Sequence, residues 1–208
     1  STWFAASDDL IKYYLDPRTY LSSSSSVFAF EKLSYDSSQT RSGVEAILSG
    51  TFMHNSRPSG SSSTYSSMII TAAKKSGVSP YHIASRIKQE VGGSMTSGTN
   101  GKNASYPGIY NFYNIGAFQS AAGNAITNGL KWAASGTTYN RPWTSPSKSI
   151  IGGAIYIGEA YINVGQNTLY TQKFNVTYKD CLYWHQYMGN VQAPTVSYTH
   201  LTLPTILR

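Results

Sequence analysis

Two adjoining helical patterns constrain the fold of this chain more than any other feature. Residues 65–75 carry apolar side chains at helical spacing and are followed by Gly77, the residue type that most often ends a helix. Ser79 and Pro80 then match the N-cap and the first helical position of a second helix, whose apolar pattern stops at Gly92. The sequence therefore predicts a mostly helical domain built around this pair.

The rest of the chain adds helices and one extended segment. Further helical patterns are predicted over residues 8–15, 42–48, 121–134 and 147–164. Alternating apolar residues after Gln166 indicate extended chain over residues 169–178. Residues 92–110 are rich in Gly, Ser, Thr and Asn, which predicts a mobile loop or a hairpin. The predicted fold class is α+β, mostly helical, with one domain over residues 1–195 and a non-native or disordered tail over 196–208.

The composition favours a protein that meets polar polymers outside the cell. Only 12% of the residues are charged, about half the usual share, whereas 17 are tyrosines. The net charge of +7 is compatible with anionic wall polymers as partners, and the alternative is a generally basic secreted domain. No nucleic-acid-binding pattern accompanies the charge. No apolar run approaches the roughly 20 residues that span a membrane. The chain begins without Met or a signal-like segment, as a mature secreted product or an excised domain would.

Glu90 is the best candidate for acid–base chemistry. It closes the second helix just before Gly92 and the long loop, so a rigid element can present its carboxyl to a groove. Carbonyl groups at a helix C-terminus carry partial negative charge, and that setting suits a general acid. The alternative is a surface glutamate beside Arg86 and Lys88.

Aromatic and amide side chains follow that loop closely. Residues 106–114 hold four aromatic rings and two asparagines. Buried amides need hydrogen-bond partners, so this composition favours a groove that stacks sugar rings and binds their acetamido groups. The alternative is an aromatic core with asparagines in turns.

These segments resemble the signature of glycoside hydrolase family 73, the autolysin-type endo-β-N-acetylglucosaminidases. Residues 84–90, ending in Glu90, are followed in family order by residues 110–117, and the similarity extends over roughly residues 8–195. Further matching segments are residues 139–146, 151–154, 165–170 and 183–188. The nearest resemblance is to autolysins of clostridia and their relatives.

The resemblance implies a lysozyme-like fold with a small flexible lobe beside a substrate groove. It implies hydrolysis of the β-1,4 bond between N-acetylglucosamine and N-acetylmuramic acid in peptidoglycan. Glu90 would protonate the leaving oxygen and Tyr139 would lie near the reaction centre. The substrate-binding side chains would be Tyr110, Asn111, Phe112, Tyr113, Asn114 and Trp143. We expect a secreted, cell wall-associated monomer that needs no metal and no cofactor.

The distribution of acidic residues along the chain does not fit a mechanism with two catalytic carboxylates. Residues 91–158 contain no Asp or Glu, and the next acid, Glu159, is either a second catalytic acid or a structural partner. We therefore expect the substrate's own N-acetyl group to attack the anomeric carbon, with retention. The sequence alone leaves the retaining and inverting outcomes open.

Two other functions remain compatible with the sequence. A muramidase or a lytic transglycosylase of the same fold works with one glutamate but cleaves the other glycosidic bond. A non-catalytic cell-wall binding module would also use basic charge and stacking aromatic rings.

Overall fold

The computed structural model describes residues 4–121, 123–187 and 189–195, so the expected tail at 196–208 lies outside the described part. Helices dominate the described residues, which confirms the mostly helical prediction. Their only β-structure is two isolated bridges, Ser34 with Val78 and Ser120 with Gly123, so the β-part of the expected α+β class does not form strands there. The chain divides into unit 1, residues 1–33 with 160–208, and unit 2, residues 34–159.

Unit 1 surrounds a small aromatic core. Its helices are α1 (Asp8–Leu15), α7 (Leu169–Phe174) and three 3-10 turns, Pro17–Leu21, Ser26–Phe30 and Lys179–Cys181. Tyr20 is fully buried and meets Tyr170 edge to face, with ring centroids 5.6 Å apart. Tyr170 in turn packs on Phe174, one turn further along α7, at 5.2 Å.

The extended segment expected over residues 169–178 is wrong, because residues 169–174 form α7. Thr168 and Thr171 make a reciprocal capping box at the start of this helix. The helix then buries Leu169, Tyr170 and Phe174. Tertiary packing of these side chains overrides the alternating pattern that indicated a strand.

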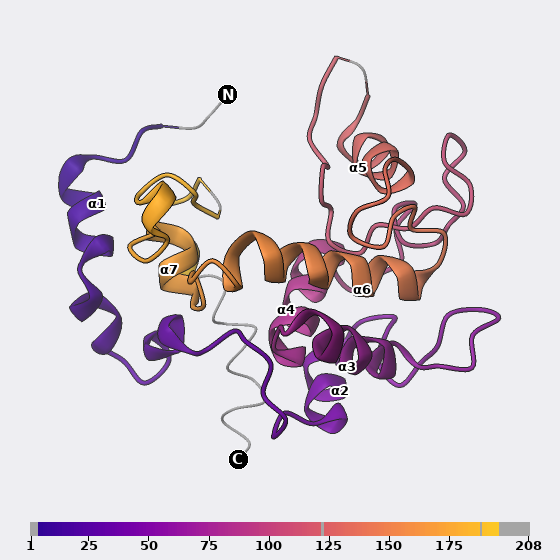
Figure 1. The fold of residues 1–208 in the computed structure, drawn as a ribbon, viewed down its shortest axis with the longest axis horizontal. Coiled ribbons are helices and arrows are strands. Elements are labelled where there is room, and N and C mark those ends of the chain that lie inside the picture. Colours follow the sequence, from indigo (N-terminus) through magenta and orange to yellow (C-terminus); the bar gives the residue numbers. More distant parts are fainter. Residues whose placement is uncertain (1–3, 122, 188, 196–208) are drawn as a thin grey trace. The chain divides into compact units, whose positions relative to one another are not determined.

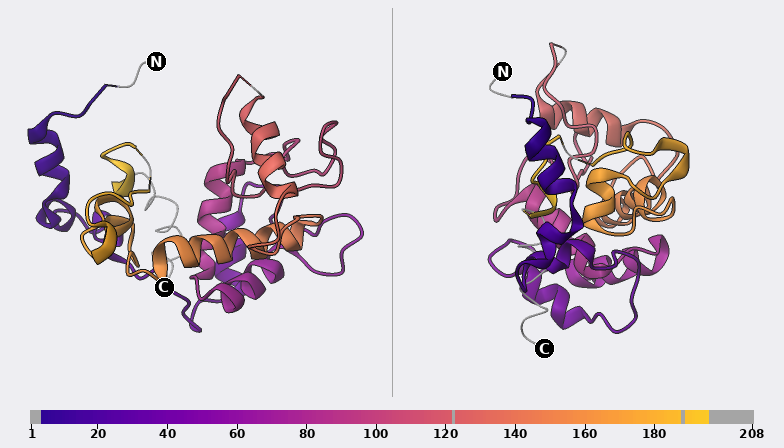
Figure 2. Two further views of the ribbon diagram at one scale, coloured as in Figure 1. Left: turned by 45° about the horizontal axis from the view of Figure 1, so that its top comes forward. Right: turned by 90° about the vertical axis from the view of Figure 1, so that its left-hand side faces the viewer.

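Unit 2 holds the larger set of helices. These are α2 (Arg41–Leu48), α3 (Tyr65–Ser76), α4 (Pro80–Val91), α5 (Ala125–Ala134) and α6 (Pro146–Ile157). α2, α3 and α4 pack against one another, and α6 runs alongside α3 (Figures 1 and 2). The pair predicted from sequence is confirmed: Gly77 ends α3 with a φ of 71°, and the Ser79 side chain accepts from the His82 N–H at the start of α4.

Two helix boundaries differ from the sequence prediction. α5 begins at Ala125 rather than at residue 121, because the Asn124 side chain caps it by accepting from the Thr127 N–H at 2.9 Å. α6 ends at Ile157, and a π-helical turn follows over residues 158–162 instead of continuous α-helix to 164. The loop at 92–110 folds back on itself, since Gly108 N donates to Gly101 O and Asn111 N donates to Gly98 O, both at 2.8 Å.

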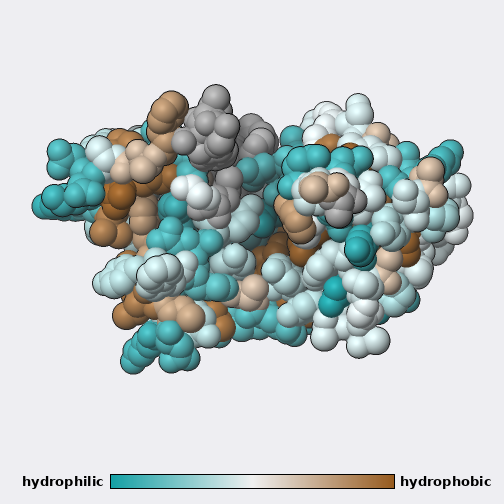
Figure 3. Space-filling model, turned by 90° about the horizontal axis from the view of Figure 1, so that it is seen from above, coloured by the Kyte–Doolittle hydropathy of each residue, from teal (hydrophilic) through white to brown (hydrophobic). Residues whose placement is uncertain are grey.

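The described surface mixes polar and aromatic side chains. On the face drawn in Figure 3, hydrophobic residues reach the surface in small groups among hydrophilic ones. Aromatic rings are exposed in both units, for example Phe118 at 62% and Trp184 at 87%. No helix within the described ranges is both long and apolar enough to cross a membrane.

Candidate active site

Glu90 lies in the last turn of α4 and is partly exposed. The Asn114 amide donates to the Glu90 backbone carbonyl at 2.8 Å and to carboxylate Oε2 at 3.4 Å. Asn114 has a φ of 51°, a left-handed conformation that Asn tolerates better than most residues. The aromatic segment is thus tied directly to the helix end that carries the candidate acid.

Four of the predicted substrate-binding side chains are buried. The exposed fractions of Asn111, Phe112, Tyr113 and Trp143 are 2%, 0%, 3% and 0%. Sequence reasoning assigned them to direct sugar contact, and their burial corrects that assignment. The alternative interpretation, an aromatic core with asparagines in turns, describes these four residues.

The polar atoms of these four residues are satisfied within the protein. Asn111 Nδ2 donates to the carbonyls of Ile115 at 2.9 Å and Gly129 at 3.0 Å. The Tyr113 hydroxyl donates to the Ile150 carbonyl at 2.7 Å. Buried amide and hydroxyl groups are stable only with such partners. The hydrogen bonds of Asn111 and Tyr113 therefore hold the backbone of residues 110–117 in place.

Tyr139 belongs to a cluster of aromatic rings with Trp132 and Tyr156, and the sequence predicted only Tyr139 as part of the site. Its ring lies 6.4 Å from that of Trp132, nearly parallel at 20°, and 5.1 Å from that of Tyr156, nearly perpendicular. The Arg141 guanidinium lies 4.1 Å from the Trp132 ring centroid. Tyr139 is partly exposed, with a φ of 56° that is uncommon for an aromatic residue. Nothing in the local pattern around Trp132 and Tyr156 predicts that they meet Tyr139.

Two adjacent glycines of α6 bring these parts together. A Cβ atom added at Gly152 would lie 2.1 Å from Tyr139 O, and one at Gly153 would lie 2.0 Å from the Tyr113 ring. Only glycine permits both contacts, because no real Cβ approaches other atoms so closely. α6 therefore contacts both the Tyr139 backbone and the Tyr113 ring, and Tyr113 directly precedes Asn114.

Tyr110 remains accessible and lines a separate cavity of about 290 Å³ with Tyr65, Met95 and Lys102. Its hydroxyl packs against the backbone of Gly101, where a Cβ would lie 2.4 Å away. Tyr110 N donates to Trp143 O at 3.0 Å, which joins this edge of the site to the segment that follows Tyr139.

Glu159 does not lie beside Glu90. It is exposed beyond the end of α6, and the preceding Gly158 packs against the Ser76 carbonyl, just before α4 begins. Glu90 lies near the opposite end of α4, about 15 Å from Pro80 along the helix axis at about 1.5 Å per residue. Paired glycosidase carboxylates stand about 5 to 10 Å apart, so the geometry does not support Glu159 as a second catalytic acid.

Two buried ionisable groups lie in α4 and next to it. Burial, and secondarily the charge of Arg86, lowers the pKa of His82 to about 3, so its imidazole is neutral. Burial raises the pKa of the Tyr113 phenol against the opposing effect of Arg86. Within the described part of the chain, no three His, Cys, Asp or Glu side chains gather where they would hold a metal ion.

Relatives of this chain are found among wall-lytic proteins. No protein-family model matches it. A β-N-acetylglucosaminidase of Bacillus subtilis strain 168 is 29% identical over 193 residues, which are 91% of this chain and 20% of that protein. A bifunctional autolysin of Staphylococcus epidermidis is 29% identical over 181 residues, 83% of this chain and 12% of that protein. The chain thus spans about a fifth or less of the length of these relatives.

Solved structures share its fold. Glucosaminidase B of Staphylococcus aureus matches with a TM-score of 0.69 at 22% identity, covering 98% of this chain and 74% of that one. Autolysin E of the same organism matches with a TM-score of 0.69 at 21% identity, covering 98% and 80%. A catalytic mutant of autolysin E, solved in complex with the disaccharide NAG-NAM, also matches with a TM-score of 0.69, at 20% identity and the same coverage.

Proposed function

We propose that this chain, a homologue of the autolysin glucosaminidases, hydrolyses the β-1,4 bond between N-acetylglucosamine and N-acetylmuramic acid in peptidoglycan. The observation that carries the proposal is the placement of Glu90, fixed by Asn114 at a helix end and partly exposed. The names of the relatives support the reaction, and the NAG-NAM complex of a structural neighbour supports the substrate class. We assign the catalytic domain to residues 1–195, with a lysozyme-like fold.

Glu90 acts as the general acid and then as the general base. The acetamido oxygen of N-acetylglucosamine attacks its own anomeric carbon while the bond to the leaving oxygen breaks, and Glu90 protonates that oxygen. The product is an oxazolinium ion and a shortened glycan. Glu90 then removes a proton from a water molecule that opens the ring, so that the anomeric configuration is retained.

The site residues divide by exposure. Glu90 and Tyr139 are the proposed catalytic pair, and Asn114 and Tyr110 are the proposed sugar contacts, because all four remain partly accessible. The proposed supporting residues are Asn111, Phe112, Tyr113 and Trp143 beneath the site, and Trp132 and Tyr156 beside Tyr139.

The substitution Glu90→Gln tests the assignment directly. We expect lysis of purified peptidoglycan to fall by about 10² to 10⁴-fold, the usual contribution of a general acid. Circular dichroism would verify that the variant is folded. The matched control is Glu159→Gln, which should leave lysis unchanged. Lysis that survives in Glu90→Gln would contradict the proposal.

The released fragments identify the bond. After borohydride reduction, mass spectrometry should find new ends as N-acetylglucosaminitol. Muramitol ends would instead identify a muramidase, and 1,6-anhydromuramic acid ends a lytic transglycosylase. Wall binding without any released fragment would identify a binding module.

We further propose a secreted monomer that acts at the cell wall, without nucleic acid, metal or cofactor. The net charge of +7 supports attraction to anionic wall polymers.

A further inference from the structure

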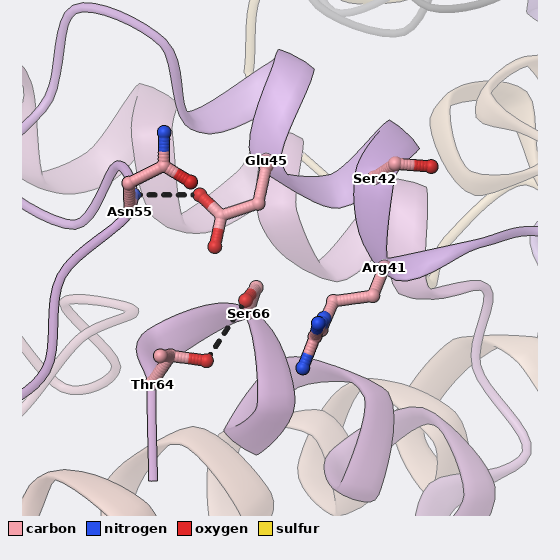
Figure 4. A pocket seen from close by; sticks show the side chains of 6 residues that line it. All are labelled: Arg41, Ser42, Glu45, Asn55, Thr64 and Ser66. Carbon is pink, nitrogen blue, oxygen red and sulfur yellow. Dashed lines mark hydrogen bonds between the residues drawn. The ribbon is translucent and has the colours of Figure 1, made fainter.

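A polar cavity of about 390 Å³ lies between α2 and the N-terminal end of α3. Figure 4 shows the side chains around it, and none of them is apolar: Arg41, Ser42, Glu45, Asn55, Thr64 and Ser66. Ser66 is 1% exposed and shares a hydrogen bond of 3.0 Å with Thr64, whose side chain caps α3. None of these residues belongs to the proposed active site.

The cavity holds opposite charges that do not pair. Arg41 and Glu45 are one helical turn apart on α2, yet the ion pairs of the described residues lie elsewhere, between Lys12 and Asp9 and between Arg18 and Asp16. Glu45 Oε2 instead accepts from the Asn55 backbone N–H at 2.7 Å. In Figure 4 the Glu45 carboxylate turns toward Asn55, while the Arg41 guanidinium extends toward α3. A carboxylate and a guanidinium therefore line the same cavity without pairing with each other.

A second cavity of about 350 Å³ shares Arg41 as a wall residue. It adds Lys74 of α3, together with Tyr35, Ser37, Gln39, Ser67 and Ile70. The charges along the two cavities thus run from Glu45 to Arg41 to Lys74, one negative followed by two positive. The N-terminal end of the α3 dipole adds partial positive charge near Ser66.

We propose that these two cavities bind a short peptide that carries one ammonium group and free carboxylates. The ammonium lies at Glu45, one carboxylate lies at Arg41 beside Ser66, and a second carboxylate lies toward Lys74. Resting on the proposed function, the source of this ligand is the stem peptide of the wall, whose diamino acid supplies an amine. A phosphate polymer fits less well, because Glu45 would repel it. A bare glycan also fits less well, because it carries no charges to match Glu45, Arg41 and Lys74.

Peptide binding to the Glu90→Gln protein tests this site without glycan cleavage. The probe is a synthetic N-acetylated tetrapeptide with one free lysine amine, one glutamate side chain and a free C-terminal carboxylate, titrated by NMR. We expect Glu45→Gln to weaken binding by about fivefold, a loss typical of one exposed charge pair. Acetylating the lysine amine should weaken binding to the parent protein and leave binding to Glu45→Gln unchanged. Arg41→Gln should weaken binding of the carboxylate peptide but not of its amide.

The matched control is Lys75→Gln, an exposed neighbour of Lys74 that lines neither cavity. It should bind the peptide with the same affinity as the parent, which is the Glu90→Gln protein without a further substitution. Equal affinity for the peptide in the parent and Glu45→Gln would overturn the proposal. So would tighter binding of a glycerol-phosphate oligomer to Glu45→Gln than to the parent, since that identifies an anionic-polymer site. Failure of the proposed function would appear separately, as lysis that survives in Glu90→Gln.

Discussion

Asn114 links the aromatic loop to the candidate acid through a single amide. Its Nδ2 reaches both the Glu90 backbone carbonyl and one carboxylate oxygen. We expect Asn114→Ala to lower kcat by about tenfold, roughly the value of one hydrogen bond to a charged group, with a smaller effect on KM. Steady-state kinetics on soluble glycan fragments would measure both constants.

Asn114→Gly is the matched control for backbone strain. Residue 114 has a left-handed conformation, which glycine adopts freely and alanine does not. If the amide matters for catalysis, both variants lose the same kcat while only Asn114→Ala loses additional stability. Activity retained in Asn114→Gly would show that the amide does not position Glu90.

His82 makes stability depend on pH. Its pKa is lowered to about 3 in the fold, chiefly by burial, whereas an unfolded histidine titrates near 6.5. The unfolded chain therefore binds the extra proton first, and the fold loses stability as pH falls from about 6.5 toward 3. We expect the free energy of unfolding to fall by roughly 1 kcal/mol per pH unit from this residue alone.

Urea unfolding of the parent and His82→Gln between pH 7 and pH 4.5 measures that dependence. Subtracting the two curves removes the contribution of the carboxylates, which both proteins share. The parent should lose more stability than the variant on acidification. If the free energy of unfolding depends on pH equally in both proteins, His82 does not cause the loss of stability.

At the scale of elements, local signals predicted the helices that carry the site. Gly77, Ser79 and Pro80 define the junction between α3 and α4 by backbone chemistry alone, and the structure confirms it. α7 was not predictable in that way. Its capping box uses Thr171 in place of the usual glutamate or glutamine, and its stability comes from burial against Tyr20, which is distant in sequence.

As with the helices, only part of the site could be predicted from the sequence. Glu90 and Tyr139 were identified from sequence, and the structure leaves both partly exposed. The burial of Phe112 and Trp143 was not predictable, because aromatic residues serve cores and sugar sites equally well. Trp143 packs against Gly152, and Phe112 packs against Phe52 and Tyr65, so their burial depends on contacts between segments far apart in the chain.

The capping box of α7 gives a prediction for unit 1. Thr168 accepts from Thr171 N at 3.0 Å, and Thr171 Oγ1 accepts from Thr168 N at 3.0 Å. We expect Thr168→Ala to destabilise α7 by about 1 kcal/mol, the usual value of an N-cap. Hydrogen exchange of the α7 amides would show faster exchange than in Thr137→Ala, an exposed control in unit 2. Equal protection in the two variants would contradict the role of the box.

At the scale of the molecule, the distribution of acids limits the mechanism. Unit 2 has four acids, Asp36, Glu45, Glu90 and Glu159. Asp36 accepts from the Ser38 N–H, Glu45 accepts from the Asn55 N–H, and Glu159 lies beyond the other end of α4. In the part of the chain that the structure describes, neither Glu45 nor Glu159 forms a hydrogen bond with Glu90. With Glu90 as the one catalytic carboxylate, we propose that the acetamido group of the substrate acts as an internal nucleophile.

Removing that acetamido group is therefore the decisive substrate change. We expect peptidoglycan with de-N-acetylated glucosamine to be cleaved at least about 10²-fold more slowly, because an internal nucleophile is lost. Chemical re-acetylation of the same material should restore the rate, which controls for damage to the glycan. NMR of the first product should show the retained β-anomer. An inverted anomer, or full activity on the de-N-acetylated glycan, would instead require a second carboxylate that activates water directly.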